Sequence, residues 1–90
     1  MKIAHIFISG FVQGIGFRQF IKKSGEETQV TGWVRNLSDG RVEAVLQGRI
    51  EDIEKLIMLC RKGPFLSEVE NVDVEWKEDQ RELEGFEIVT

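Results

Sequence analysis

The chain passes from a strand-like run into a helix-like run through the stretch Gly10-Phe11-Val12-Gln13-Gly14-Ile15-Gly16-Phe17-Arg18. A glycine-rich turn between a strand and a helix can direct several backbone N–H groups into one concavity, with the positive end of the helix behind it. That geometry binds an anion of the size of phosphate. Arg18, in the first turn of the helix, adds a planar guanidinium with five donors, which suits phosphoryl oxygens. The stretch therefore predicts a phosphate-binding loop with its own arginine.

The residues that this loop lacks narrow its chemistry. A nucleotide-binding P-loop continues after its last glycine with Lys and Ser or Thr, whereas Gly16 is followed by Phe17 and Arg18. A phosphatase of the cysteine type needs a thiolate inside the loop, and the only cysteine, Cys60, lies far along the chain in an apolar helical run. No set of His, Cys and carboxylate residues has ligand-like spacing. Attack by water is then the simplest chemistry, and we expect no metal and no cofactor.

Alternation and helical spacing divide the chain into seven elements. An apolar stripe at i, i+3, i+4 and i+7 from Ile53 to Cys60 indicates the second helix, and Gly63-Pro64 ends it. Asp39-Gly40 indicates a hairpin between the second and third strands. The predicted elements are strands at residues 3–12, 30–37, 41–47, 69–77 and 86–89, and helices at about residues 17–27 and 50–62. The order β-α-β-β-α-β predicts a ferredoxin-like α+β sandwich, in which two helices cover one face of an antiparallel sheet and a short extra strand follows at the C-terminus.

A second polar position of interest is Asn36, which ends the strand-like run from Gly32 just before a Ser-Asp-Gly turn. An Asn amide can both donate to and accept from a water molecule, and it stays neutral at every working pH. In the predicted topology, the turn after the first strand and the end of the second strand approach each other at one edge. We therefore expect Asn36 to lie beside the phosphate-binding loop. Arg35 alternates with it and should face the other way.

Length and composition fit a small globular protein. Ninety residues, 41% hydrophobic and 31% charged, make a single domain over residues 1–90 with a modest core. Residues 68–87 carry nine acidic against two basic side chains; this acidic tail is most simply solvated surface, and it would also repel nucleic acid. No stretch approaches the length of a membrane span, and a lone cysteine cannot form an intrachain disulfide. We expect a cytoplasmic monomer with no nucleic-acid or membrane partner.

Taken together, the motifs resemble those of the acylphosphatase family. They are the loop from Gly10 to Arg18, the segment from Gly32 to Asn36 with Asp39-Gly40, Gly48, Lys62-Gly63-Pro64, and a closing Gly85-Phe86-Glu87-Ile88. These matches run over nearly the whole chain in the order and spacing of the family. The resemblance implies the ferredoxin-like fold and the metal-independent hydrolysis of small acyl phosphates to a carboxylate and inorganic phosphate.

The resemblance also implies which residues do the work. Arg18 and Asn36 are the catalytic residues that it implies, Arg18 as the charge partner of the phosphate and Asn36 as the group that orients the attacking water. The side chain of Gln13 is left for a structural role, and the proton acceptor is implied to be an oxygen of the substrate phosphate. The phosphate-binding backbone N–H groups are those of Gln13, Gly14, Ile15, Gly16, Phe17 and Arg18.

The chain departs from the family pattern at positions that bear on stability more than on chemistry. Phe11 stands where the family often has a basic side chain, and Gln29 stands where a glycine commonly ends the first helix. Ser24, Gly25 and Thr28 make that helix less apolar, and Gly25 lowers its helical propensity by about 1 kcal/mol relative to Ala. We expect Phe17 and Trp33 in the core.

Two other functions stay open at this point. One is a non-catalytic, regulatory anion-binding module like the acylphosphatase-like domains inside larger maturation proteins; the bare domain with both Arg18 and Asn36 argues against it. The other is an RNA-binding domain of similar fold, which would place stacking aromatic residues on the open face of the sheet. Phe7 and Phe11 could serve there, but the chain has no tyrosine and is acidic.

Overall fold

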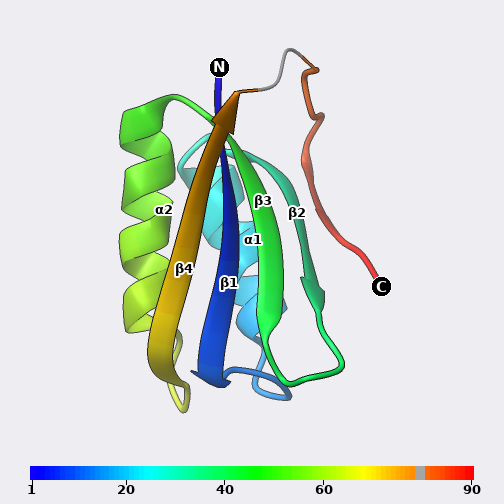
Figure 1. Ribbon diagram of the computed structural model, residues 1–90, viewed down its shortest axis with the longest axis vertical. Coiled ribbons are helices and arrows are strands. Elements are labelled where there is room, and N and C mark those ends of the chain that lie inside the picture. The colour runs from blue at the N-terminus through cyan, green and yellow to red at the C-terminus, as the bar shows by residue number, and fades with distance from the viewer. Residues whose placement is uncertain (79–80) are drawn as a thin grey trace.

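The computed structural model describes residues 1–78 and 81–90 (Figure 1). Its elements, in chain order, are β1 (Lys2–Phe11), α1 (Phe17–Glu27), β2 (Thr31–Asn36), β3 (Val42–Gly48), α2 (Ile50–Lys62), β4 (Glu68–Glu78) and β5 (Phe86–Ile88). Each predicted element is present, with ends that differ from the prediction by no more than one residue. The periodicity of the apolar residues was therefore a sufficient guide to the local structure.

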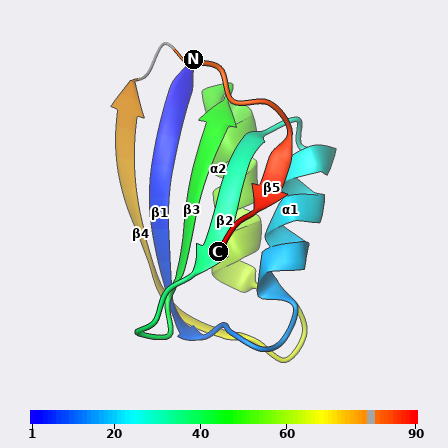
Figure 2. The same ribbon diagram turned by 90° about the vertical axis from the view of Figure 1, so that its right-hand side faces the viewer.

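The five strands form one sheet in the order β4-β1-β3-β2-β5. The strand β1 runs antiparallel to both β3 and β4, β2 runs antiparallel to β3, and β5 adds a parallel pairing to the outer edge of β2. Figure 2 shows both helices on one face of this sheet, while the other face is left without a helix. The ferredoxin-like α+β sandwich with a short C-terminal strand is confirmed.

The core lies between the helices and the sheet. Cross-strand register places Ile6 opposite Ala44 of β3 and Val74 of β4, so that apolar side chains meet in rows across the sheet. The helices face these rows with their apolar stripes. The largest fully buried side chains are Phe17, Ile6, Ile8, Ile21, Leu46, Ile53, Leu56, Gln47, Val12, Val34, Val42 and Cys60.

The polar residues of α1 have specific packing roles. A Cβ atom on Gly25 would lie 2.6 Å from the ring of Phe86, so glycine is what lets β5 approach the helix. The hydroxyl of Thr28 donates to the carbonyl of Ser24 at 2.8 Å at the end of the helix. The lower apolar content of α1 therefore reflects close packing against β5 and a hydrogen-bonded end rather than a defect.

The face of the sheet without helices carries a network of charged residues, which we call the open-face network: His5, Arg35 and Glu43. The Nε2 atom of His5 and the Nε atom of Arg35 each lie 2.6 Å from the Glu43 carboxylate, and Glu43 is only 6% exposed.

Phe17 is buried as predicted, but the prediction for Trp33 was wrong. Trp33 lies half-buried on this open face because its neighbours on β2, Gly32 and Val34, alternate with it and point inward.

Candidate active site

A hollow of about 270 Å³ lies where β1 turns into α1 and where β2 ends. We call it the loop hollow. Figures 1 and 2 show the connection from β1 to α1 at the same end of the sheet as the last residues of β2. Both predicted catalytic residues, Arg18 and Asn36, line it. The complete lining consists of Val12, Gly14, Gly16, Phe17, Arg18, Gln19, Asn36 and Ile88.

The turn from β1 into α1 contributes two glycines, Gly14 and Gly16, to the lining of the loop hollow. Gly14 and Gly16 have φ angles of 79° and 80°, in the left-handed region where an L-residue would be strained. Gly16 is also the N-cap of α1, and its carbonyl accepts from the N–H of Phe20 at 3.0 Å. The N–H groups that precede Phe20 have no acceptor inside the helix, so they and the helix dipole give this end a partial positive charge.

Arg18 is the second residue of α1 and is half-buried beside the hollow. Within residues 1–78 and 81–90, its guanidinium makes no ion pair or hydrogen bond with any side chain or carbonyl. By contrast, Arg35, Arg41 and Arg49 each contact a carboxylate at 2.6 to 2.9 Å. The loop hollow therefore holds a full positive charge that the described part of the protein leaves uncompensated.

Asn36 is the last residue of β2 and is one of the residues that line the hollow. Its Oδ1 atom is buried and has no hydrogen-bond partner in the described part of the chain. Leaving a buried acceptor unpaired costs about 1–3 kcal/mol, and such atoms in native structures are rare and call for an explanation. An Asn that served only as a turn or capping residue would have its side-chain oxygen bonded to a backbone N–H.

The side chain of Gln13 joins the loop to the turn between β2 and β3. Its Nε2 atom donates to the carbonyl of Leu37 at 2.8 Å and to the carbonyl of Arg41 at 2.9 Å. Leu37 directly follows Asn36, so one amide fixes the loop relative to the strand end that carries Asn36. The structural role expected for this side chain is the one that its contacts show, and its backbone N–H stays a predicted phosphate donor.

The loop hollow includes residues that sequence reasoning missed. Gln19 follows Arg18 in the first turn of α1, and a polar side chain in that turn was the only available signal. Ile88 lines the hollow because β5 joins the sheet beside β2 with Ile88 opposite Val34. Conversely, Ile15 packs against the core and does not line the hollow, so it anchors the loop while its predicted N–H contact is untested.

Two alternative reaction types find no support in the described chain. Burial raises the pKa of the Cys60 thiol to about 12, so this core residue is no nucleophile. Residues 1–78 and 81–90 contain no cluster of three or more His, Cys, Asp or Glu side chains that could hold a metal ion.

In the same residues, neither helix has the length and apolar character that crossing a membrane requires.

Comparison with known proteins gives the family of the chain. The sequence model of the family described as Acylphosphatase matches residues 4–88. A protein named Acylphosphatase from Chloroflexus aurantiacus is 51% identical over 86 residues, which are 96% of this chain and 94% of that protein.

Solved structures agree. The crystal structure of acylphosphatase from Bacillus subtilis has a TM-score of 0.97 and 30% identity, with complete coverage of both chains. The crystal structure of HypF from T. kodakarensis matches with 36% identity and a TM-score of 0.86. The matched region covers 99% of this chain but only 12% of the HypF chain. The chain therefore belongs to the acylphosphatase family, and the hydrolase class expected from its motifs is confirmed.

Proposed function

We propose that the protein hydrolyses the carboxyl–phosphate bond of small acyl phosphates without a metal ion, and that the loop hollow is the active site. The observation that carries this proposal is the meeting of the Arg18 guanidinium and the Asn36 amide oxygen, which have no partners within residues 1–78 and 81–90, at the N-terminal end of α1. Folding gains nothing from leaving both groups unpaired. A ligand that pairs with both groups would explain why the fold leaves them unpaired.

The phosphate of the substrate occupies the loop hollow. Its nonbridging oxygens accept from the backbone N–H groups of Gln13 to Arg18, where no intrahelical acceptor competes. The guanidinium of Arg18 supplies the opposing charge in a bidentate geometry. Because these donors are fixed before the substrate arrives, they stabilise the charge on the transferring phosphoryl group without reorganisation, which is commonly the largest catalytic contribution.

Asn36 positions the attacking water. The water donates to the amide oxygen, which is otherwise an unpaired buried acceptor, and its own oxygen faces phosphorus. As the bond from water to phosphorus forms, the bond from phosphorus to the carboxyl oxygen breaks and its electron pair leaves with the carboxylate. The proton of the water passes to an oxygen of the phosphate. A carboxylate is a good leaving group, so no general acid is required.

The second candidate is the regulatory anion-binding module. The likeness to one part of the much longer HypF chain favours keeping it as an alternative. Such a module needs the phosphate-binding loop and Arg18 but has no use for a water-positioning amide. The unpaired Oδ1 of Asn36 therefore favours the enzyme.

The test is the hydrolysis of benzoyl phosphate in the presence of a chelator, measured for the wild type, Arg18→Ala and Asn36→Ala. Inorganic phosphate is titrated as an inhibitor, or by calorimetry for a variant without turnover. We expect Arg18→Ala to lose both turnover and phosphate binding. Asn36→Ala should keep its phosphate affinity and lose about 10²–10³-fold in kcat, the range for removing one positioned polar group.

The matched control is Asn71→Ala, which removes the other asparagine, an exposed residue of β4 that contacts Asp73. It should leave kcat and KM unchanged. A folded wild type that binds phosphate and leaves the acyl phosphate intact would favour the regulatory module. If Asn36→Ala weakened phosphate binding as strongly as Arg18→Ala, the water-positioning role would be wrong.

A further inference from the structure

The two edges of the sheet differ in how much main chain they leave open. At one edge, β5 has only three residues. At the other edge, β4 has eleven residues and pairs with β1 on one side only, so that Figures 1 and 2 show it as the outermost strand. Proteins usually blunt an edge of that length with proline or several lysines. The strand β4 contains no proline and one lysine, so its outer edge is able to pair with another strand.

A groove of about 270 Å³ lies between this edge and the helix α2, and we call it the edge groove. Its lining consists of Glu54, Ile57, Met58, Arg61, Val74 and Trp76. Ile57 and Val74 belong to or pack against the core, whereas Met58 is 70% exposed and Trp76 is 42% exposed. The edge groove therefore offers apolar surface directly beside an unpaired strand, where a side chain of an added strand can be buried.

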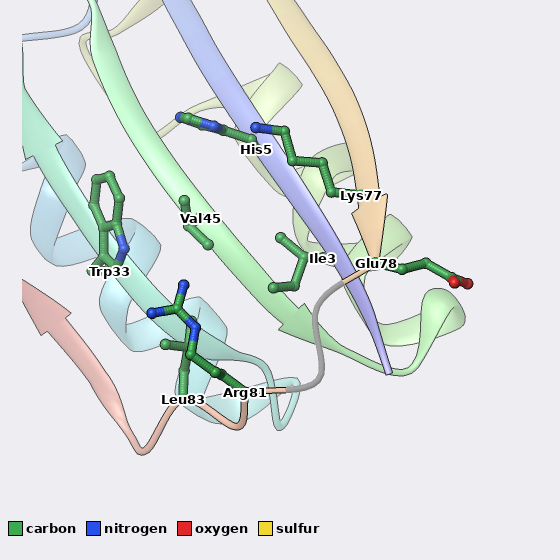
Figure 3. Close-up of a pocket in the computed structure, with 8 residues that line it drawn as sticks. All are labelled: Ile3, His5, Trp33, Val45, Lys77, Glu78, Arg81 and Leu83. Carbon is green, nitrogen blue, oxygen red and sulfur yellow. The ribbon is translucent and has the colours of Figure 1, made fainter.

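The register of β4 places its apolar and charged residues on opposite faces. Val74 and Trp76 lie opposite Ile6 and Ala4, which are fully buried under the helices. The residues that alternate with them lie on the open face of the sheet. Figure 3 shows Lys77 on that face, with β1 and β3 between it and Trp33 on β2.

The same alternation holds at the beginning of β4. Val69 packs against the core, so Glu68 and Glu70 on either side of it lie on the open face. Neither of these carboxylates makes an ion pair within residues 1–78 and 81–90. Asp73 and Glu75 continue the acidic row, and Glu75 contacts Lys77 only at 3.7 Å. Along β4, five acidic side chains stand against one basic side chain.

This charge decides which kind of strand fits the edge. Antiparallel pairing of two copies of β4 would place the acidic residues of one copy opposite those of the other, and like charges in that position are destabilising. A strand with lysine or arginine at the same positions would instead form cross-strand pairs of opposite charge. A second copy of the chain is therefore disfavoured, and a basic strand is favoured.

From these observations we propose that β4 and the edge groove bind an extended, basic segment of a partner protein by strand addition. The main chain of the segment pairs with the outer edge of β4. Its alternate apolar side chains contact Met58 and Trp76, and its lysine or arginine side chains lie opposite Glu68 and Glu70 on the open face. The edge groove shares no lining residue with the loop hollow, so this binding does not depend on the proposed hydrolysis.

The test uses three capped heptapeptides. Lys-Val-Lys-Leu-Lys-Val-Lys has the alternation and charge of the proposed segment. Glu-Val-Glu-Leu-Glu-Val-Glu keeps the alternation and reverses the charge, and Lys-Lys-Val-Leu-Val-Lys-Lys keeps the charge and breaks the alternation. Binding is followed by the NMR shift of the Trp76 indole N–H, with the indole N–H of Trp33, the other tryptophan, as an internal reference.

The alternating basic peptide should shift Trp76 and leave Trp33 unchanged. For so small an interface we expect a Kd on the order of 0.1–1 mM. The acidic peptide should bind at least about tenfold more weakly, because several charge pairs become repulsive. The peptide without alternation should bind about fivefold more weakly, because its apolar side chains do not all fall on the face of the groove.

Charge-removing variants locate the basic side chains. The double variant Glu68→Gln with Glu70→Gln should weaken the alternating basic peptide by about three- to tenfold. The matched control is Glu27→Gln with Glu87→Gln, which removes the same charge from two exposed positions in α1 and in β5, at the opposite edge of the sheet. It should leave the affinity unchanged.

A second pair of variants tests the apolar contact. Met58→Ser should weaken the alternating basic peptide by about threefold, because it removes apolar surface from the edge groove. Ile50→Ser removes an exposed apolar side chain at the beginning of the same helix, outside the groove, and should have no effect.

Five results would overturn the proposal. They are equal affinity for the acidic peptide, equal affinity for the peptide without alternation, a shift of Trp33 as large as that of Trp76, an equal effect of either control, and no shift of Trp76 at the highest peptide concentration. A shift of Trp76 when the protein alone is concentrated would assign the edge to a second copy instead. Each variant is checked for an unchanged NMR spectrum away from β4, so a loss of binding cannot be confused with a loss of folding.

Discussion

The loop hollow and the open-face network treat polar side chains in opposite ways. In the network, His5 and Arg35 each reach the Glu43 carboxylate at 2.6 Å, so three polar side chains satisfy one another. In the loop hollow, Arg18 has no partner in the described chain and the Oδ1 of Asn36 is buried without one. The two regions lie on the same small sheet, and in the sequence their residues look equally polar.

The difference shows how stability and function are divided in this protein. A satisfied buried network contributes to folding, because removing one member leaves the others unpaired. An unsatisfied pair costs folding free energy and is useful only when a ligand completes it. The comparison therefore predicts that substitutions in the loop hollow change catalysis with little effect on unfolding, and that substitutions in the network do the reverse.

The largest effect should come from replacing each of the two arginines of this comparison with alanine. Arg18→Ala should lower kcat/KM for benzoyl phosphate by about 10³-fold or more, because an arginine on a transferring phosphoryl group is commonly worth that much. Its unfolding midpoint in urea should stay close to the wild-type value. Arg35→Ala should show the opposite pattern, a loss of about 1 kcal/mol of stability with unchanged turnover, since Arg35 is half-exposed and solvent screens its ion pair.

These paired measurements would contradict the comparison if the substitution of either arginine strongly changed both turnover and stability. A large loss of stability in Arg18→Ala would mean that its charge serves folding through the dipole of α1. A large loss of activity in Arg35→Ala would mean that the open-face network reaches the loop hollow through β2.

Gln13 stands between the two regions in character, because its side chain is satisfied but lies next to the site. Gln13→Ala removes both hydrogen bonds to the turn after β2 and should lower kcat by about 10- to 100-fold, since a displacement of about 1 Å has that effect on positioned groups. Gln13→Glu is the sharper variant. It keeps the shape but puts a carboxylate against the carbonyls of Leu37 and Arg41, so it should be worse than Ala.

Phosphate affinity measured on both Gln13 variants separates the two parts of the site. If the amide only fixes Asn36 relative to the loop, phosphate inhibition should change less than kcat. An equal loss in both would show that Gln13 shapes the phosphate-binding backbone itself.

The open-face network makes a prediction about pH. Burial by itself would raise the pKa of Glu43, but hydrogen bonds from His5 and Arg35 outweigh it and hold the pKa below its ordinary value of 4.5. A carboxyl group with a lowered folded pKa stabilises the fold above its unfolded pKa, and this contribution is lost as the pH falls through the folded value. Glu43→Gln should therefore lose about 1–2 kcal/mol at pH 7, and the gap to the wild type should close well below pH 4.5.

Urea unfolding of both proteins across this pH range is the measurement. Asp39→Asn is the control, because the pKa of Asp39 is also lowered by Arg41, through its backbone and side-chain hydrogen bonds, but the pair is exposed. It should barely move the midpoint at any pH. A constant gap between Glu43→Gln and the wild type down to low pH would mean that Glu43 stabilises by packing and not by its charge.

Sequence reasoning predicted what depends on local pattern and chain order. Strand alternation and the apolar stripe of α2 set the ends of the elements, and the order of the elements brought Arg18 and Asn36 to one hollow. It did not predict features that depend on how the C-terminal segment folds back. Ile88 reaches the loop hollow only because β5 pairs with β2, and Leu83 is held against the sheet only because its N–H donates to the amide oxygen of Gln47. Neither contact leaves a periodic signal in the sequence.

The predicted position of Trp33 in the core was wrong for a related reason. A large aromatic residue on a strand usually indicates the core, and hydrophobicity alone does not say which face of the sheet is covered by helices. The alternation of Gly32 and Val34 with Trp33 decides it: the first two point inward, so Trp33 falls on the face of the sheet that no helix covers.

The smallest predicted effect tests whether stability can be changed without touching either region. Gln29 follows α1 with a φ of 62°, and the helix ends there in a Schellman motif, in which the N–H of Val30 donates to the carbonyl of Gly25 at 2.8 Å. A non-glycine residue in the left-handed region carries about 1 kcal/mol of strain. Gln29→Gly should remove that strain and raise stability by up to about 1 kcal/mol, less the extra freedom of glycine in the unfolded chain.

For a domain of this size, a gain of that amount corresponds to a rise of about 4–8 °C in Tm, which differential scanning calorimetry resolves. Gln29→Ala is the matched variant, since it keeps the strain and should not be stabilised. Turnover should be the same in all three proteins, because Gln29 does not line the loop hollow. A stabilised Gln29→Gly protein with lower kcat would show that the end of α1 communicates with Arg18 at its beginning, and that the loop hollow depends on strain that the fold retains elsewhere.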